Sequence, residues 1–373
     1  MMLIVFICLF IIGSYFLLIF GFILGLFRLN SKYQEHHDCV SFSVVIPFRN
    51  EADNLPNLLK SILELHYNTS LFEVILVNDD STDTSVEIIT AFKQLHTDIT
   101  INVINNNRQS NSPKKDAIST AIENATYNWI ICTDADCELP AHWLISYSNC
   151  INAKDPNMIV GPVSIKSNTS FLEQFQLIDF LSMQGATMGG FGIGQPFMAN
   201  GANLGYKKDV FLQLNGFENN NSIASGDDVF LLENFMSYDR ENVLFLKDQN
   251  ALVTTLPTRT WAELVNQRKR WAAKATHFKN SFTKIVGVIV FFANVLSILA
   301  LFMGFFNFYF IWMICLKLVI DTILIYNTAH IYQQHISNTA YIKTVLYYPL
   351  FTSFIAISSL MTTFEWKGRA FKK

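Results

Sequence analysis

Two aspartates separated by one residue, Asp134 and Asp136, are the first candidates for chemistry in this chain. They follow residues 129–133, an apolar run that we expect to be a buried strand, so both carboxylates can reach one small site. Hard cations such as Mg²⁺ and Mn²⁺ prefer oxygen ligands and often share them with substrate phosphates. The pair therefore indicates a site for a divalent cation and phosphate, although a solvated turn can have the same sequence.

A second polar cluster follows the apolar run 72–77 and reads Asn78-Asp79-Asp80-Ser81-Thr82-Asp83. One interpretation is that a side chain of this cluster caps the helix that follows. The other is that a carboxylate faces the base or ribose of a nucleotide. The two interpretations are compatible with each other, because one turn can present both kinds of group.

A third acidic cluster precedes a helix-like run over 229–235 and reads Ser225-Gly226-Asp227-Asp228. The glycine lets the backbone turn tightly at this point. One of the two carboxylates can act as a general base that takes a proton from a hydroxyl group. A capped helix start is the alternative interpretation of the same residues.

A basic and aromatic segment lies within an amphipathic stretch over 261–278 and reads Gln267-Arg268-Lys269-Arg270-Trp271. Since an apolar run follows it, one interpretation is an interfacial helix whose Lys and Arg side chains face lipid headgroups. In the other interpretation, Arg270 contacts a phosphate, while Trp271 stacks against an acceptor or closes the site.

These clusters fall between regularly alternating elements. Apolar runs over 42–46, 72–77, 99–104 and 129–133 predict buried strands. Helical spacing of apolar residues over 51–65, 83–95 and 113–125 predicts helices between them. The alternation predicts an α/β fold with a mostly parallel sheet covered on both faces. Ligands of such sheets bind beyond the carboxyl ends of the strands, where the polar clusters lie.

The composition predicts membrane segments at both ends. Only 15% of the residues are charged, against about 25% in a soluble domain, and residues 2–27 contain no charge. About 20 apolar residues span a bilayer as a helix, and neither a basic start nor a cleavage site of a signal peptide is visible, so we expect a retained anchor. Because Arg28 and Lys32 follow this anchor, the domain is expected in the cytosol. The net charge of −3 argues against a nucleic-acid partner.

Three further apolar stretches, over 285–304, 305–326 and 344–363, follow the polar region, with a turn expected at Gly304 and Asn307. Lys317 and Asp321 lie four residues apart in the second stretch and can pair on one helix face. Three spans would put the C-terminus outside, whereas the basic tail over 365–373 indicates the inside. Either the charge rule fails here, or one stretch is re-entrant or interfacial.

The clusters, in this order over residues 42–271, resemble inverting glycosyltransferase family 2 in its membrane-integrated branch. That branch includes the cellulose, hyaluronan and poly-N-acetylglucosamine synthases and the ceramide glucosyltransferases. Residues 44–51 resemble the first strand and turn of the family, and 77–83 resemble its V-D-D-G-S-T-D motif. Residues 134–136 resemble its D-x-D motif, 226–228 its acidic E-D site, and 267–271 its Q-x-x-R-W motif. The resemblance implies a GT-A-like domain.

The resemblance also implies roles for individual residues. Asp79 would contact the nucleotide base, and Lys114, with Lys115 as the other candidate, would approach the nucleotide. Asp134 and Asp136 would hold the diphosphate and a divalent cation, Mg²⁺ or Mn²⁺, with Asp136 the more direct ligand. Asp228 would be the general base. The remaining matches are in two groups: Gln267, Arg270 and Trp271 would shape the pyrophosphate and acceptor region, and residues 200–203 would form a loop at the sugar and acceptor terminus.

Two positions depart from the family pattern. Asp80 stands where a glycine is usual, which puts the local turn in doubt. Asp227 replaces the commoner glutamate before the base, so the proton acceptor can be either Asp227 or Asp228. Two adjacent carboxylates near a cation and a diphosphate can also titrate as a coupled set.

We therefore expect an enzyme that transfers a sugar, with inversion, from a nucleotide-sugar to a lipid or glycan acceptor at the membrane. A uridine diphospho-sugar is the donor that the family resemblance favours. A processive polysaccharide synthase is one alternative, and a catalytically inactive membrane scaffold that keeps the fold is another. The small number of apolar segments argues against a transporter.

Three regions are expected in the chain. Residues 1–28 form an N-terminal anchor, and residues 29–280 form the catalytic domain, which includes an interfacial helix over 260–279. Residues 281–373 form a membrane region with two or three spans. The resulting prediction is an integral protein of the cell (inner) membrane whose catalytic domain faces the cytosol.

Overall fold

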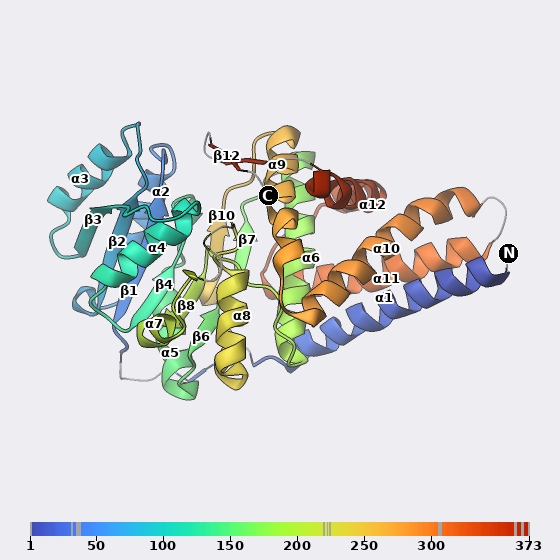
Figure 1. Ribbon diagram of the computed structural model, residues 1–373, viewed down its shortest axis with the longest axis horizontal. Coiled ribbons are helices and arrows are strands. Elements are labelled where there is room, and N and C mark those ends of the chain that lie inside the picture. Colours follow the sequence, from blue (N-terminus) through green and yellow to red (C-terminus); the bar gives the residue numbers. More distant parts are fainter. Residues whose placement is uncertain are drawn as a thin grey trace.

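A computed structural model of the chain describes residues 2–30, 33–34, 39–218, 221, 223, 225–304, 308–361, 364–366 and 369–371. An α/β region occupies one end of the molecule and long apolar helices occupy the other (Figure 1). The predicted fold class is confirmed, since the main sheet is mixed but mostly parallel and helices cover it.

The main sheet has seven strands in the order β3-β2-β1-β4-β8-β6-β9. Its first four strands correspond to the predicted ones, are parallel, and comprise β1 (Phe42–Phe48), β2 (Phe72–Asn78), β3 (Thr100–Asn105) and β4 (Trp129–Cys132). The other three are β6 (Met158–Val160), β8 (Leu204–Lys207) and β9 (Val243–Phe245), of which β8 runs antiparallel to both neighbours. Phe48 pairs with Asn78, so the polar segments after β1 and β2 begin at the same sheet edge.

Alternating side chains of the central strands fill a core on each face of the sheet. Val45 packs toward α4 (Pro113–Asn124), whereas Val44 and Ile46 pack toward α2 (Leu55–Leu63) and α5 (Trp143–Lys154). The helix predicted over 83–95 is α3 (Ser85–Leu95). The prediction that a helix begins at residue 51 is wrong. The Glu51 carbonyl instead accepts from the Asn54 and Leu55 amides in a turn that leads into α2.

A second, three-stranded sheet and a long helix extend this region. The sheet has the order β5-β10-β7 and consists of β5 (Cys137–Glu138), β10 (Val253–Thr255) and β7 (Val163–Ile165). After β7 the chain enters α6 (Phe171–Gly192), which the sequence did not reveal. Two shorter helices, α7 (Lys208–Gln213) and α8 (Val229–Tyr238), follow later in the chain.

Four helices are long and apolar enough to cross a bilayer, which indicates an integral membrane protein. They are α1 (Met2–Arg28), α10 (Ser281–Met303), α11 (Tyr309–Ile331) and α12 (Asn338–Met361). The last three begin four to six residues before or after the predicted boundaries. The turn expected at Gly304 and Asn307 lies partly outside the described residues, because 305–307 are not described.

The helices α1, α10 and α11 pack side by side, whereas α12 is strongly foreshortened in Figure 1 and therefore runs in a different direction. α12 packs against α10, α6 and α9 (Trp261–Ala273). The helix predicted over 260–279 is α9 followed by a 3₁₀ turn over Lys274–His277. Beyond α12, the short strand β11 (Phe364–Trp366) pairs with β12 (Arg369–Phe371) and contacts α9.

Glycines bring the backbones of α1 and α6 into direct contact. A Cβ atom at Gly25 would lie 2.1 Å from the carbonyl oxygen of Gly189. A Cβ atom at Gly192 would lie 1.8 Å from the carbonyl oxygen of Gly25. Larger residues would therefore push the two helices apart, which is the reason small residues are common where membrane helices cross closely.

Candidate active site

A cavity of about 170 Å³ opens at the carboxyl ends of β1, β2 and β4. Four residues that the sequence singled out line it, namely Asp79, Lys114, Asp134 and Asp136, and Arg270 reaches it from α9. The cavity has polar groups in its wall because each of these strands is followed by charged or amide residues. The fold thus brings Arg270 to within reach of Asp79, which is 191 positions earlier in the chain.

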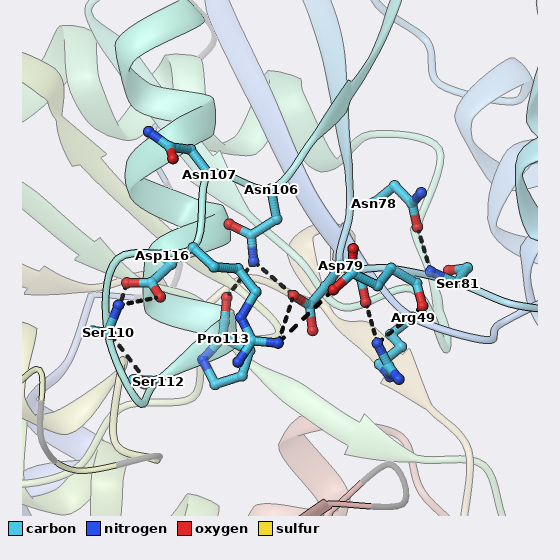
Figure 2. Close-up of polar contacts among 12 residues, drawn as sticks. Arg49, Asn78, Asp79, Ser81, Asn106, Asn107, Ser110, Ser112, Pro113 and Asp116 are labelled. Carbon is cyan, nitrogen blue, oxygen red and sulfur yellow. Dashed lines mark hydrogen bonds and ion pairs between the residues drawn. The ribbon is translucent and has the colours of Figure 1, made fainter.

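Asp79 is buried at the end of β2 and is held by three basic or amide side chains (Figure 2). Asn106 donates from Nδ2 to Asp79 Oδ1 at 2.8 Å, and Arg108 Nη1 lies 3.8 Å from the same oxygen. Arg49 Nη1 donates to the Asp79 carbonyl oxygen at 2.6 Å and to the Asp80 carbonyl oxygen at 2.9 Å. Because both arginines face this one turn, the cavity wall can attract an anionic ligand.

Asp80, which stands where the family has a glycine, adopts a φ of +56°. This left-handed conformation is one that aspartate and asparagine tolerate better than other non-glycine residues. Asn78 Oδ1 supports the turn by accepting from the Ser81 amide at 2.9 Å. The departure at residue 80 therefore keeps the conformation that a glycine would provide.

Lys114 joins two of the acidic clusters. Its Nζ atom lies 2.6 Å from Asp134 Oδ1 and 3.1 Å from Asp227 Oδ2. Burial alone would lower the pKa of Lys114, but the carboxylates of Asp134, Asp227 and Asp228 outweigh burial and raise it. Lys114 therefore stays charged at neutral pH and holds the acidic groups together.

Lys115 points away from this cluster. Its Nζ atom donates to the Ile223 carbonyl oxygen at 2.9 Å and lies 5.1 Å from the centroid of the Phe230 ring. Burial lowers the pKa of Lys115 to about 8, although the nearby Asp227 and Asp228 carboxylates raise it in part. Of the two candidate lysines, Lys114 is the one that lines the cavity.

The two neighbouring aspartates have different surroundings. The Asp227 carboxylate faces Lys114, and although burial raises its pKa, Lys114 and Lys274 together bring the pKa below its usual value. Asp228 caps α8, because its Oδ1 accepts from the Val229 amide at 2.7 Å. The same oxygen lies 2.9 Å from Lys274 Nζ. Asp227 is thus directed toward Asp134, while Asp228 is directed toward the segment between α9 and α10.

The segment over 200–203 has both a site role and a structural one. Gly201 lies against the charged cluster, since a Cβ atom there would be 2.7 Å from Asp227 Oδ2 and 3.1 Å from Lys114 Nζ. Asn203 is fully buried, and its amide group makes four hydrogen bonds. The partners of Asn203 are Trp143 Nε1, Tyr147 OH and the carbonyl oxygens of Pro162 and Ala251.

The basic segment of α9 divides between the cavity and the helix layer. Arg270 lines the cavity; burial lowers the pKa of its guanidinium, while the Asp227 and Asp134 carboxylates counteract that change. Arg268 instead forms a buried ion pair with Asp179 of α6, with Nε 2.7 Å from Oδ2, and its Cζ lies 4.2 Å from the Trp271 ring centroid. Gln267 Oε1 accepts from Arg268 Nη1. Gln267 and Trp271 therefore contact Arg268 and are not among the residues that line the cavity.

Asp134 and Asp136 are both carboxylates that face the cavity, which suits an oxygen-binding cation. Among the residues that the structure describes, no group of three or more His, Cys, Asp or Glu side chains is arranged to hold a metal ion. Mg²⁺ is commonly bound by one or two carboxylates and completes its shell with substrate phosphates and water. The donor set therefore fits a cation that binds together with a phosphorylated ligand.

Arg49, Asn106 and Arg108 were not identified from the sequence. All three nevertheless lie within three residues of the end of a strand, since β1 ends at Phe48 and β3 ends at Asn105. The rule that drew attention to the acidic clusters, that ligands bind beyond the carboxyl ends of parallel strands, applies equally to basic and amide residues. Applied to every residue type, it would have found them.

Comparison with known proteins agrees with this geometry. Residues 129–359 match the sequence profile described as "Glycosyl transferase family group 2", and residues 43–212 match "Glycosyl transferase family 2". The fold at this sheet edge, the acidic clusters and the two matches together assign the class: the chain belongs to glycosyltransferase family 2.

Individual relatives share part of the chain. A poly-beta-1,6-N-acetyl-D-glucosamine synthase of Staphylococcus epidermidis is 27% identical over 157 residues, which is 40% of this chain and 35% of the relative. The protein of the same name from Staphylococcus aureus (strain MSSA476) is 28% identical over 142 residues, 36% of this chain and 32% of the relative. The chain thus spans about a third of the length of the curated relatives it matches.

A solved structure supports the fold over nearly the whole chain. The mannosyltransferase PcManGT from Pyrobaculum calidifontis, in complex with GDP-Man and Mn²⁺, is 16% identical and superposes with a TM-score of 0.57. The superposition covers 95% of this chain and 99% of that protein. The similarity therefore includes the membrane helices as well as the α/β region.

Proposed function

We propose that the protein transfers a sugar, with inversion of the anomeric carbon, from a nucleoside diphospho-sugar to an acceptor at the membrane. The observation that carries the proposal is the cavity at the sheet edge, where Asp79, Asp134, Asp136 and Arg270 converge beside Lys114. A uridine diphospho-sugar is the donor that we favour. The domain division 1–28, 29–280 and 281–373 is part of the same proposal.

Each side of the cavity is suited to one part of such a donor. Asp79 sits in the deep turn after β2, where its carboxylate, held by Asn106 and Arg108, can accept a hydrogen bond from a nucleotide base. Arg270 faces the centre of the cavity, where it can stabilise the negative charge that grows on a departing diphosphate. Lys114 holds Asp134 and Asp227 in place between these two ends.

Asp134 and Asp136 would hold Mg²⁺ or Mn²⁺ when the donor is bound, with Asp136 the more direct ligand. The cation, when bound, neutralises charge on the diphosphate leaving group. In the family pattern the second aspartate of the pair is the more direct ligand, and Asp134 Oδ1 shares its position with the Lys114 ammonium group at 2.6 Å. The proposal predicts that the loss of the Asp136 carboxylate reduces cation dependence more than the loss of the Asp134 carboxylate.

Asp228 is the proposed general base. Its ion-pair partner Lys274 lies in the 3₁₀ turn between α9 and α10, so Asp228 faces the direction from which a membrane acceptor arrives. A carboxylate in this place takes the proton of the acceptor hydroxyl, and the oxygen attacks the anomeric carbon from the face opposite the diphosphate. No covalent intermediate on the protein is required, because a single displacement inverts the configuration.

The test compares Asp228→Asn and Asp227→Asn in detergent-solubilised protein. We expect Asp228→Asn to lower kcat by about 10²–10⁴-fold while donor affinity stays the same, because only proton transfer is lost. Asp227→Asn should weaken donor binding, since Lys114 loses one of its two partners. Asp155→Asn, which changes a carboxylate with 84% side-chain exposure, is the matched control. Near-normal transfer by Asp228→Asn would show that the base is another group.

Two observations favour one transfer to a lipid or short glycan over processive synthesis or an inactive scaffold. The described region contains only four helices that are able to span a bilayer, which is few for a polymer channel. Asp79, Asp134, Asp136 and Arg270 line one cavity, an arrangement that a scaffold does not need. Product length after incubation with labelled donor separates single transfer from polymerisation, and a scaffold would bind no nucleotide-sugar.

We also propose that α1, α10 and α11 cross the cell (inner) membrane, with the catalytic domain in the cytosol, and that α12 lies along the membrane surface on the same side. Tyr348 and Phe351 in the middle of α12 pack against Phe175 of α6. The strand β11 after α12 contacts α9, and the Ser337 amide just before α12 donates to Gln174 Oε1 of α6 at 3.0 Å. Both ends of α12 therefore pack against helices that adjoin the catalytic domain. This arrangement keeps the basic tail inside, as the charge rule requires, although residues 367–368 and 372–373 lie outside the described residues.

A cysteine placed at the C-terminus tests this arrangement in a variant with the six native cysteines replaced. In intact cells a membrane-impermeant maleimide should not label it, whereas the same reagent should label it in opened membranes. Labelling in intact cells would mean that α12 crosses the bilayer.

A further inference from the structure

A second cavity, of about 280 Å³, lies among the apolar helices and is separate from the polar cavity at the sheet edge. Five helices contribute to its walls, namely α1, α6, α10, α11 and α12. One water molecule needs about 10–15 Å³ by the same measure, so the space is large enough for a substantial ligand. Most of the lining side chains are aliphatic or aromatic, which suits a hydrocarbon chain better than a sugar.

The charged groups in the wall neutralise each other. Lys317 Nζ lies 2.6 Å from Asp321 Oδ2, and Tyr15 OH donates to Asp321 Oδ1 at 2.5 Å. Lys317 also lies 4.9 Å from the centroid of the Tyr15 ring. Because this charge pair is complete within the protein, the cavity presents no net charge to a ligand, and an uncharged chain can occupy it.

Two buried polar atoms in the wall indicate a ligand that the protein itself does not supply. Asn294 and Thr344 both line the cavity and are 1% and 2% exposed. Within the described part of the chain, neither Asn294 Oδ1 nor Thr344 Oγ1 has a hydrogen-bond partner. An unpaired buried polar atom costs about 1–3 kcal/mol, so a polar group on a bound molecule would relieve that cost.

The cavity leads toward the proposed active site. Phe197 and Met198, in the segment after α6, form part of its wall. Gly201 follows three residues later and lies against Asp227 and Lys114. Three residues of extended chain reach at most about 11 Å, so the Cα atom of Met198 in the cavity wall lies within that distance of the Gly201 Cα atom beside the charged cluster. A molecule whose chain fills the cavity can therefore present its head to the catalytic carboxylates.

We infer that this cavity binds the hydrocarbon chain of a lipid acceptor, so the acceptor is a lipid and not a free glycan. The inference rests on the proposed sugar transfer, and it specifies the substrate class of that reaction. The chain lies between α10, α11 and α12, and the hydroxyl or phosphate at its head reaches the segment at Gly201. The wall composition excludes a growing polysaccharide, which would need polar groups along its whole path.

Gly287 offers a way to close the cavity without disturbing the fold. It lines the cavity from α10, and a Cβ atom there would have no heavy atom within 4 Å. Gly287→Trp should therefore fill part of the cavity at little cost in packing. Gly13→Trp is the matched control, because Gly13 is also in an apolar helix with open space around it but does not line the cavity.

The experiment uses the full-length protein in nanodiscs with two probes, diacylglycerol and polyprenyl phosphate, each with a diazirine on its chain. After irradiation, we expect at least one probe to label peptides at Val290, Asn294 or Leu318, which line the cavity. The same lipid without diazirine should compete for this labelling. Gly287→Trp should reduce the labelling about tenfold or more, and Gly13→Trp should leave it unchanged. The probe that labels identifies the source of the chain.

Labelling that neither competes nor changes in Gly287→Trp would overturn the inference, since it would come from bulk lipid around the helices. The same holds if both probes label only outward-facing positions such as Val288 and Leu299. Donor binding is measured in parallel. A protein that binds no nucleotide-sugar but retains competed labelling would refute the proposed function and leave the lipid site standing, so the two failures are distinguishable.

Discussion

Arg268 and Arg270 lie two positions apart on α9, and the structure predicts opposite consequences for their replacement. Arg268 and Asp179 form an ion pair whose side chains are 6% and 7% exposed, with 2.7 Å between Arg268 Nε and Asp179 Oδ2. Removing one partner of such a pair leaves an uncompensated buried charge and costs about 3–5 kcal/mol. At about 2–4 °C per kcal/mol, Arg268→Met should lower the melting temperature by roughly 6–20 °C.

Arg270→Met should behave differently, because Arg270 faces the proposed donor cavity. We expect it to lower sugar transfer by about 10²–10³-fold, the usual effect of losing one group that stabilises transition-state charge, with little change in melting temperature. The assay is a melting curve of the purified protein in detergent, alongside transfer from a labelled nucleotide-sugar at a temperature below all the transitions.

The double variant Asp179→Leu/Arg268→Met provides the control. Replacing both partners of a buried pair with apolar residues is often neutral or stabilising, so most of the loss caused by Arg268→Met should be recovered. The reasoning would be refuted if Arg268→Met melted like the wild type while losing transfer. It would also be refuted if the double variant were as unstable as the single variant.

Three further predictions concern the same region. Asn203→Leu should lower stability by several kcal/mol, because four buried partners lose a hydrogen bond at about 1–3 kcal/mol each; protein yield and melting temperature measure this. Lys114→Met should reduce donor affinity at least tenfold, measured by titration calorimetry, since Asp134 and Asp227 then repel the diphosphate. Lys115 has a folded-state pKa of about 8, below its unfolded value near 10.5, so its burial opposes folding while it is charged. As the pH rises from 8 to 10, the stability of the wild type should therefore increase relative to that of Lys115→Met. Parallel melting curves of those two proteins across this range would contradict the assignment.

The sequence predicted the elements that have a clear period. The strands β1, β2 and β4 consist mainly of apolar residues and are buried on both faces, and runs of this kind bounded by polar turns are recognisable without a structure. Asp79 and Asp134 follow such strands, Lys114 lies in the first turn of α4, and the structure places all three around one cavity.

α6 escaped the sequence analysis for a physical reason. It is buried all round, so its apolar residues have no single face, and its buried positions include Gln176, Asp179 and Gln184. Those polar side chains are satisfied by partners elsewhere in the chain, such as the Thr258 amide for Gln176 and Arg268 for Asp179. Because the partners of these buried polar residues lie elsewhere in the chain, the sequence of α6 alone does not reveal that the helix is buried.

The different surroundings of Arg268 and Arg270 were also invisible in the sequence. Both belong to one basic segment, and one step of two residues turns a helix by about 200°. Whether Arg268 or Arg270 faces α6 depends on how α9 packs between α6 and the cavity. That packing is a property of the assembled fold. Side-chain types therefore indicated the chemistry, and the tertiary contacts assigned it to a residue.

The backbone contact between α1 and α6 at Gly25, Gly189 and Gly192 has a consequence for where catalysis can take place. α6 ends at Gly192, nine residues before Gly201, so the anchor packs against a helix whose end is connected to the charged cluster by one short segment. The height of the catalytic carboxylates relative to the lipid is then set by the fold. The distance between the carboxylates and the membrane anchor is fixed, whereas the position of the bilayer surface varies with acyl-chain length. The turnover number should therefore change in bilayers with longer or shorter acyl chains.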